Sequence, residues 1–150
     1  MSAPLLVYGT AVAIEGGGVL LRGPSGAGKS DLALRLIDQG ARLVADDRVF
    51  VRREGERLLL RAPAATKGLI EIRGLGILRL EAVEEAPLVL LVDLVAAEAI
   101  ERLPREQSEN LLGLPLPLLA LAPFEPSAAA KLRLARRAYA APSNGAIMVG

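Results

Sequence analysis

The chain has 150 residues, which fits one globular domain, and its 52% hydrophobic and 23% charged residues exclude a disordered tail. The formal net charge of +1 gives no reason to expect nucleic acid or an anionic membrane as a partner. Cysteine and histidine are both absent, which excludes a thiol nucleophile and Cys-ligated zinc. A general base that acts near neutral pH must therefore be a carboxylate, a lysine or a group of the substrate.

The residue pattern in the first half of the chain predicts three strands, then one helix, then three further strands. Short apolar runs separated by glycines are typical of strands, and they lie at residues 5–7, 10–14, 19–22, 42–45, 49–53 and 58–62. Between the third and fourth of these runs, apolar residues recur at helical spacing over 31–39. Gly40 follows as a helix stop signal.

The second half continues with strands at 69–72, 77–80, 88–92 and 116–121. A short helical stretch is expected near 96–102, and prolines punctuate 104–126. Ser127 is a suitable cap for a last helix over 127–137, which carries a basic face. The whole pattern predicts a single α/β domain over 1–150, with a mixed sheet flanked by few helices.

No targeting or membrane segment is expected. Residues 1–10 lack the basic region and apolar stretch of a secretion signal. The longest apolar runs, 87–95 and 111–124, are short or interrupted by Asp93 and by prolines, whereas a membrane helix needs about 20 apolar residues. The expected location is the cytoplasm.

One motif carries a specific chemistry. The segment GPSGAGKS matches the phosphate-binding loop (P-loop) pattern G-x-x-x-x-G-K-[ST] at every fixed position, directly after an apolar run and directly before the predicted helix. Its glycines let backbone N–H groups approach phosphate oxygens, its lysine neutralises phosphate charge, and its serine hydroxyl can bind Mg²⁺. The nucleotide-binding residues predicted from it are Gly23, Pro24, Ser25, Gly26, Ala27, Gly28, Lys29 and Ser30.

Two acidic sites could act on the nucleotide. Asp46 and Asp47 end the predicted strand after the P-loop helix, and Asp93 ends VLLVD, which has the look of a Walker B strand. Neighbouring strand residues point to opposite faces, so Asp46 and Asp47 both face the phosphates only if the chain turns there. Spacing leaves both sites open.

A third segment, EIRGLG at 71–76, combines charged residues with glycines. Glu71 and Arg73 alternate with apolar neighbours, and the glycines indicate a tight turn. From spacing alone this is a hairpin with a solvated polar face.

Together these segments resemble the catalytic domain of HPr kinase/phosphorylase. GPSGAGKS, then RLVADD at 42–47, then EIRGLGIL at 71–78 stand in the order and spacing of that family. The P-loop is shared with many families, whereas EIRGLG after a VADD strand is specific to this one. The resemblance covers about 8–139, and the length and Leu/Pro-rich tail are most similar to the truncated alphaproteobacterial form, which lacks the N-terminal domain of the longer enzymes.

The resemblance implies a bacterial protein-serine kinase that uses ATP and Mg²⁺ to phosphorylate an HPr-like phosphocarrier. It also implies a P-loop kinase domain of the phosphoenolpyruvate carboxykinase-like type, and a homo-oligomer, a hexamer in the family. Lys29 and the rest of the P-loop would bind the phosphates, with Ser30 and Glu71 at Mg²⁺. The catalytic base would come from the Asp46–Asp47 pair, with Arg73 in the family signature and Arg102 aligned with the arginine of a YDRL segment.

Two positions depart from the family pattern. A family histidine upstream of the P-loop is replaced by Tyr8, whose ordinary pKa of about 10 makes it a poor base near neutral pH. The family's basic RPGRN-like loop corresponds to PFEPSA at 123–128, which contains no arginine. Both departures weaken the expectation of the reverse, phosphorylase reaction.

Two alternatives stay open at this level. A P-loop kinase of small molecules would carry the same GPSGAGKS motif, although such kinases usually have an arginine-rich lid, and no clear lid is present. A nucleotide-sensing module that has lost turnover is the other alternative, and Tyr8 is the residue that favours it.

Overall fold

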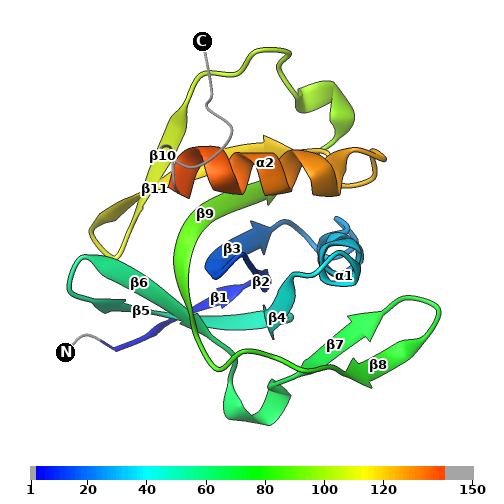
Figure 1. Cartoon of the computed structure of the whole chain (residues 1–150), viewed down its shortest axis with the longest axis vertical. Helices are drawn as coiled ribbons and strands as arrows, with labels where there is room; N and C mark the ends of the chain where they lie inside the picture. Colours follow the sequence, from blue (N-terminus) through cyan, green and yellow to red (C-terminus); the bar gives the residue numbers. More distant parts are fainter. Residues whose placement is uncertain (1–2, 141–150) are drawn as a thin grey trace.

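The computed structural model of the protein describes residues 3–140. Its strands are β1 (Leu5–Tyr8), β2 (Thr10–Ile14), β3 (Gly17–Arg22), β4 (Arg42–Ala45), β5 (Arg48–Glu54), β6 (Arg57–Arg61), β7 (Leu69–Ile72), β8 (Gly76–Arg79), β9 (Ala86–Leu94), β10 (Gln107–Leu111) and β11 (Leu114–Leu121). Its helices are α1 (Lys29–Asp38) and α2 (Ala128–Ala140), with 3-10 turns η1 (Ala64–Thr66) and η2 (Ala97–Ala99). The predicted α/β class, a mixed sheet with few helices, is confirmed (Figure 1).

The main sheet is organised around β9. It runs in the order β1-β5-β6-β9-β3-β2-β4, and β11 also pairs with β9 and carries β10 on its other side. β9 pairs antiparallel with β6 at its start and parallel with β11 at its end, so it curves through the middle of the molecule (Figure 1). It is also parallel to β3. The carboxyl ends of β3, β9 and β11 therefore lie at one edge, which is where ligands of open α/β sheets bind.

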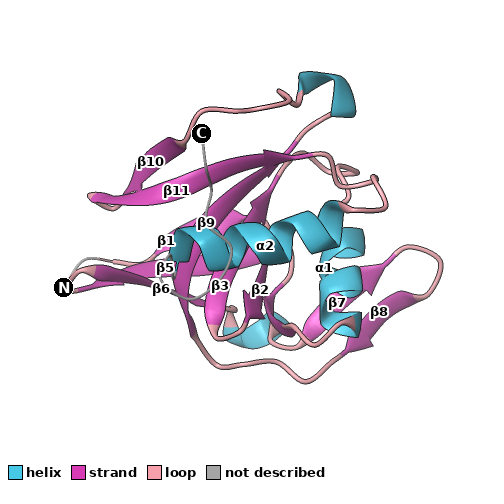
Figure 2. Cartoon of the chain, turned by 45° about the horizontal axis from the view of Figure 1, so that its top comes forward, coloured by secondary structure: helices cyan, strands magenta, loops and turns pink. Residues whose placement is uncertain are grey.

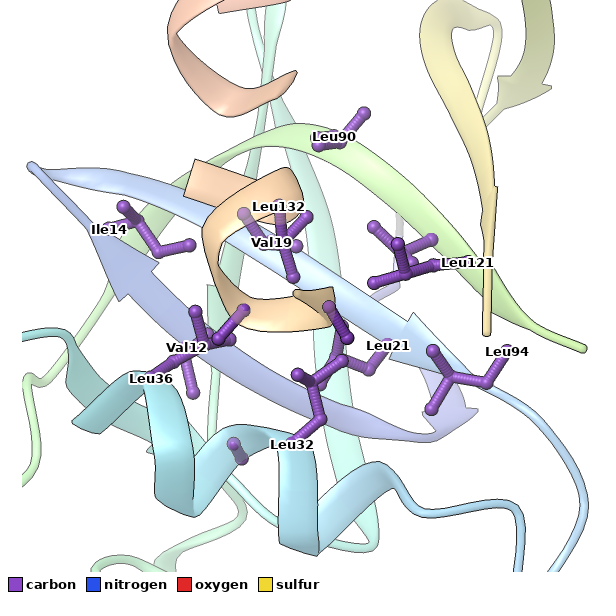
Figure 3. Packing of buried hydrophobic residues seen from close by; sticks show 14 of the residues in the cluster. Val12, Ile14, Val19, Leu21, Leu32, Leu36, Leu90, Leu94, Leu121 and Leu132 are labelled. Atoms are coloured by element: carbon purple, nitrogen blue, oxygen red, sulfur yellow. The ribbon is translucent and has the colours of Figure 1, made fainter. Parts of the chain in front are cut away.

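Two apolar layers lie on the two faces of the sheet. Leu32 and Leu36 of α1 and Leu132 of α2 pack against Leu21 of β3 and are fully buried (Figure 3). Leu20 points the other way and belongs to the second layer, as the period of two along a strand requires. Burying a leucine side chain stabilises the fold by about 1.5–3 kcal/mol, so this packing fixes α1 against the sheet (Figure 2).

Most predicted elements are present within a few residues of their predicted bounds, but the second half of the chain differs from the prediction in two places. The helical stretch expected at 96–102 forms only the turn η2, and Ile100 is already extended. Strand β10 was not predicted, because its polar sequence QSENL lacks an apolar alternation and is recognisable only through its pairing with β11. Among residues 3–140, no helix is both long enough and apolar enough to cross a membrane.

Candidate phosphate-binding and catalytic site

The P-loop connects the end of β3 to the start of α1, as the motif predicts. Gly26 and Gly28 have positive φ angles of 82° and 98°, where other residues are strained. A Cβ atom on Gly23 would lie 2.9 Å from the Ala27 Cβ, so the loop closes tightly on itself. The glycines are therefore required by the shape of the loop.

The backbone N–H groups in the first turn of α1 face the P-loop. Gly28 precedes the helix, and no side chain of residues 3–140 caps these groups. Uncapped N–H groups and the positive end of the helix dipole form an anion site. The Lys29 ammonium adds its charge there, because its Nζ donates to the carbonyl oxygens of Gly23 at 2.6 Å and Pro24 at 3.0 Å.

Asp46 is the centre of a hydrogen-bond network below the loop. It is 8% exposed, and its Oδ1 accepts from the hydroxyls of Ser30 at 2.9 Å and Thr10 at 2.8 Å. Its Oδ2 accepts from the backbone N–H of Glu71 at 3.1 Å. One carboxylate thus connects the P-loop helix, β2, the end of β4 and β7. All three predicted segments, GPSGAGKS, VADD and EIRGLG, meet at this group.

Thr10 is the member of this network that sequence reasoning missed. It is fully buried at the start of an otherwise apolar strand, TAVAI. A buried hydroxyl needs a hydrogen-bond partner. A polar residue at one end of an apolar run was the available signal.

Asp47 has a different environment from its neighbour. Its φ is 70°, so the chain turns there, and the two carboxylates do not alternate as they would in a strand. Its side chain is 79% exposed and lies 3.8 Å from the Nε of Arg48. The Arg48 guanidinium in turn lies 6.0 Å from the centre of the exposed Tyr8 ring. The chain therefore turns between Asp46 and Asp47, which is the condition under which both acids could face one site.

Among the described residues, Asp93 takes no part in the Asp46 network and is paired with Arg22 instead. Arg22, its parallel-strand partner, donates from Nε to Oδ1 of Asp93 at 2.8 Å. The same guanidinium donates two further bonds to Glu109 of β10, at 2.7 and 2.8 Å. This pairing raises the pKa of Arg22 and lowers the pKa of Glu109 through their hydrogen bonds. Asp46, not Asp93, is hydrogen-bonded to the P-loop serine.

The remaining predicted residues have exposed side chains. The backbone of Glu71 joins the Asp46 network, and its side chain is exposed on β7. Arg73 lies at the turn between β7 and β8, which form the predicted hairpin with an exposed polar side chain. Arg102 is exposed between η2 and β10. The described contacts connect neither arginine to the P-loop.

The donor set is compatible with Mg²⁺. Mg²⁺ prefers oxygen ligands and is usually bound by one or two protein carboxylates together with substrate phosphates. Ser30 and Asp46 bring a hydroxyl and a carboxylate together next to the phosphate loop. No group of three or more acidic side chains within residues 3–140 forms a metal site without phosphate ligands. The residues therefore fit an ion that is bound together with a nucleotide.

Residues 1–128 match the family model described as "HPr Serine kinase C-terminal domain". The chain belongs to this family. The three motifs that suggested it lie within the matched stretch and come together around Asp46.

Individual relatives agree with the family match. The chain is 51% identical over 73 residues to the HPr kinase/phosphorylase of an Exiguobacterium species, covering 48% of this chain and 24% of the relative. It is 51% identical over 78 residues to the HPr kinase/phosphorylase of Listeria monocytogenes, covering 51% and 25%. The matched stretch is thus about a quarter of these relatives. The solved structure of an HPr(Ser) kinase/phosphatase from Coxiella burnetii matches with a TM-score of 0.77 and 27% identity, covering 86% of this chain and 91% of that one.

Proposed function

We propose that this protein is an ATP- and Mg²⁺-dependent protein-serine kinase that phosphorylates an HPr-like phosphocarrier. The observation that carries the proposal is the 2.9 Å hydrogen bond from Ser30 to Asp46. It joins the phosphate loop to the acidic pair in a chain that belongs to the HPr serine kinase family. The relatives' names support HPr as the acceptor.

In the proposed reaction the P-loop binds the nucleotide phosphates. Backbone N–H groups of the loop bind the phosphate oxygens, and the ammonium of Lys29 neutralises charge on the β- and γ-phosphates. Ser30 and Asp46 would hold Mg²⁺, with Glu71 as a further ligand, and the bound ion would neutralise charge on the transferred phosphoryl group. Phosphoryl transfer depends mainly on this positioning and charge neutralisation.

Asp47 is the proposed general base. The oxygens of Asp46 already accept three hydrogen bonds, whereas the Asp47 carboxylate is exposed and faces only a loose ion pair. A protein serine can reach an exposed carboxylate. The serine oxygen attacks the γ-phosphorus, the bond to the ADP oxygen breaks, and Asp47 takes the hydroxyl proton. The proposal covers this forward reaction only.

Arg73 and Arg102 are the further proposed catalytic residues. Both side chains are exposed, so both are free to meet a substrate. A guanidinium suits this role because it binds phosphate and carboxylate oxygens in pairs.

The proposal also covers the fold type, the domain organisation, the oligomeric state and the location. The antiparallel β2 on one side of β3 and the parallel β9 on the other support a phosphoenolpyruvate carboxykinase-like fold over an open parallel one. A single catalytic domain over 1–150, a hexameric or other homo-oligomeric state and a cytoplasmic location complete it. Neither nucleic acid nor a membrane is proposed as a partner.

The experiment is a transfer assay with two acceptors. Purified protein is incubated with Mg-ATP and either HPr or its nitrogen-branch counterpart, and phosphoserine is mapped by mass spectrometry. Phosphate on a serine of either carrier supports the kinase. ATP consumption that leaves no phosphate on protein and rises when small hydroxyl-bearing acceptors are added would favour a small-molecule kinase. Nucleotide binding with no consumption would favour a sensor.

A further inference from the structure

The segments that follow β9 and β11 flank the phosphate loop. β3, β9 and β11 are parallel and in register, so Leu21, Leu94 and Leu121 lie at the same end of the sheet (Figure 3). The P-loop leaves β3 at this end. Residues 95–98 leave β9 here, and residues 122–126 leave β11 and lead to α2.

These segments enclose a groove of about 700 Å³ that is continuous with the P-loop. Pro24 and Ala27 of the P-loop form part of its wall, and residues 94–98 and 122–126 form the rest. The lining is apolar except for Glu98 and Glu125. This size and composition are typical of small-ligand sites.

Phe124 is the exposed aromatic side chain of this groove. It is 70% exposed, yet its ring lies against the P-loop: a Cβ on Gly28 would be 2.9 Å from its Cζ. Leaving a phenylalanine ring in water sacrifices the free energy of its burial, about 1.5–3 kcal/mol. A ring held in this way offers a free face to a ligand that is anchored in the loop.

Arg35 fixes the segment that carries this ring. From α1 its guanidinium donates to the backbone carbonyls of Pro123 and Glu125, on both sides of Phe124. An ion pair with Asp31 at 3.0 Å orients the guanidinium. These bonds tie the backbone on both sides of Phe124 to the P-loop helix.

We propose that this groove binds the purine base of the nucleotide, with the base stacked on Phe124 and the phosphates in the P-loop. The charges are complementary along the site. The P-loop end carries Lys29 and the positive end of α1, which suit phosphates. The lining also holds two acidic residues, Glu98 and Glu125. Carboxylates accept hydrogen bonds from N–H groups such as those of a purine; the Glu125 carboxylate also lies 3.6 Å from the Nζ of Lys131.

This inference rests on the proposed function and assigns a residue to nucleotide selection. The test measures binding of a non-hydrolysable Mg-ATP analogue and of Mg-tripolyphosphate by calorimetry. The variants are Phe124→Ala, Phe124→Trp and, as the matched control, Leu134→Ala, which removes another exposed apolar side chain outside the groove. Thermal unfolding checks that each variant is folded.

Loss of the ring should weaken only the ligand that has a base. Base–aromatic stacking predicts that Phe124→Ala raises the Kd of the ATP analogue about tenfold, while the Kd of tripolyphosphate changes less than about twofold. Phe124→Trp should restore binding of the analogue, and Leu134→Ala should change neither ligand.

Three results separate this inference from the proposed kinase. If Phe124→Ala weakens both ligands equally, or neither, the base does not stack on Phe124 and the inference is wrong. If the wild-type protein binds neither ligand, the nucleotide-dependent function fails, and the inference fails with it. Base-dependent binding without phosphate transfer to a carrier would support the groove and overturn only the proposed acceptor.

Discussion

Ser30 and Asp46 stand 16 residues apart in the sequence and are joined by a hydrogen bond of 2.9 Å. The bond connects the first turn of the P-loop helix to the end of the next strand. Asp46 also accepts from Thr10 and from the backbone of Glu71, so every oxygen of this buried carboxylate is used. The network explains why the three motifs occur together: they are parts of one site.

Asp46→Asn should destabilise the fold. An amide has one acceptor oxygen, so its NH₂ group must face at least one of the three donors that Asp46 now satisfies. A buried donor without a partner costs about 1–3 kcal/mol, and the free energy of unfolding in urea should fall by that amount. Asp38→Asn, at an exposed position of α1, is the control and should change it by less than about 0.5 kcal/mol. Equal stability of the two variants would contradict the network.

Asp47→Asn should show the opposite pattern. Asn tolerates the positive φ at this position, and the side chain is exposed, so the unfolding free energy should change by less than about 0.5 kcal/mol. Phosphate transfer to the carrier should fall by about 10²–10⁴-fold, because the general base is lost. The Kd of Mg-ATP should stay unchanged. A wild-type rate of phosphate transfer by this variant would show that Asp47 is not the general base.

Lys29→Ala should abolish binding of both ATP and tripolyphosphate. The ammonium lies against the carbonyls of Gly23 and Pro24, inside the phosphate loop, so its loss removes charge where the phosphates bind. Lys67→Ala is the matched control, because Lys67 is exposed and paired with Glu84 on another part of the surface. Calorimetry with both ligands makes the comparison. Wild-type affinity of the Lys29 variant for both ligands would contradict the assignment of GPSGAGKS as the phosphate-binding loop.

Glu109→Gln should lower stability in a pH-dependent way. Arg22 lowers the pKa of Glu109 through their hydrogen bonds, so the pair stabilises the fold above the unfolded-state pKa of about 4.3. That contribution is lost as the pH falls through the lower, folded-state pKa. The wild type should exceed the variant by about 1 kcal/mol at pH 7 and low salt, since the carboxylate is partly exposed and screened. The difference should shrink as the pH falls through that lowered pKa, and a difference that grows in acid would contradict the assignment. Nucleotide affinity should not change.

The sequence allowed prediction of the parts that depend on local pattern. The P-loop and the 71–76 hairpin have glycines where their backbone has positive φ, and the VADD strand corresponds to a short apolar run. Strand β10 could not be predicted, because a polar strand is defined by its partner and not by its own residues. The pairing of Asp93 with Arg22 likewise depends on the register of β3 with β9, which no local pattern encodes. The place of Phe124 beside Gly28 depends on the same parallel strands.

The central claim is transfer of phosphate from ATP to a carrier serine by the Asp46–Asp47 site. The most direct test is the intact mass of HPr after incubation with Mg-ATP and either the wild-type protein or Asp47→Asn at equal, ATP-saturating concentrations. The account predicts one added phosphate on a serine with the wild type and a rate lower by about two orders of magnitude or more with the variant. An HPr mass that stays unchanged with a wild-type protein shown to bind ATP would contradict it.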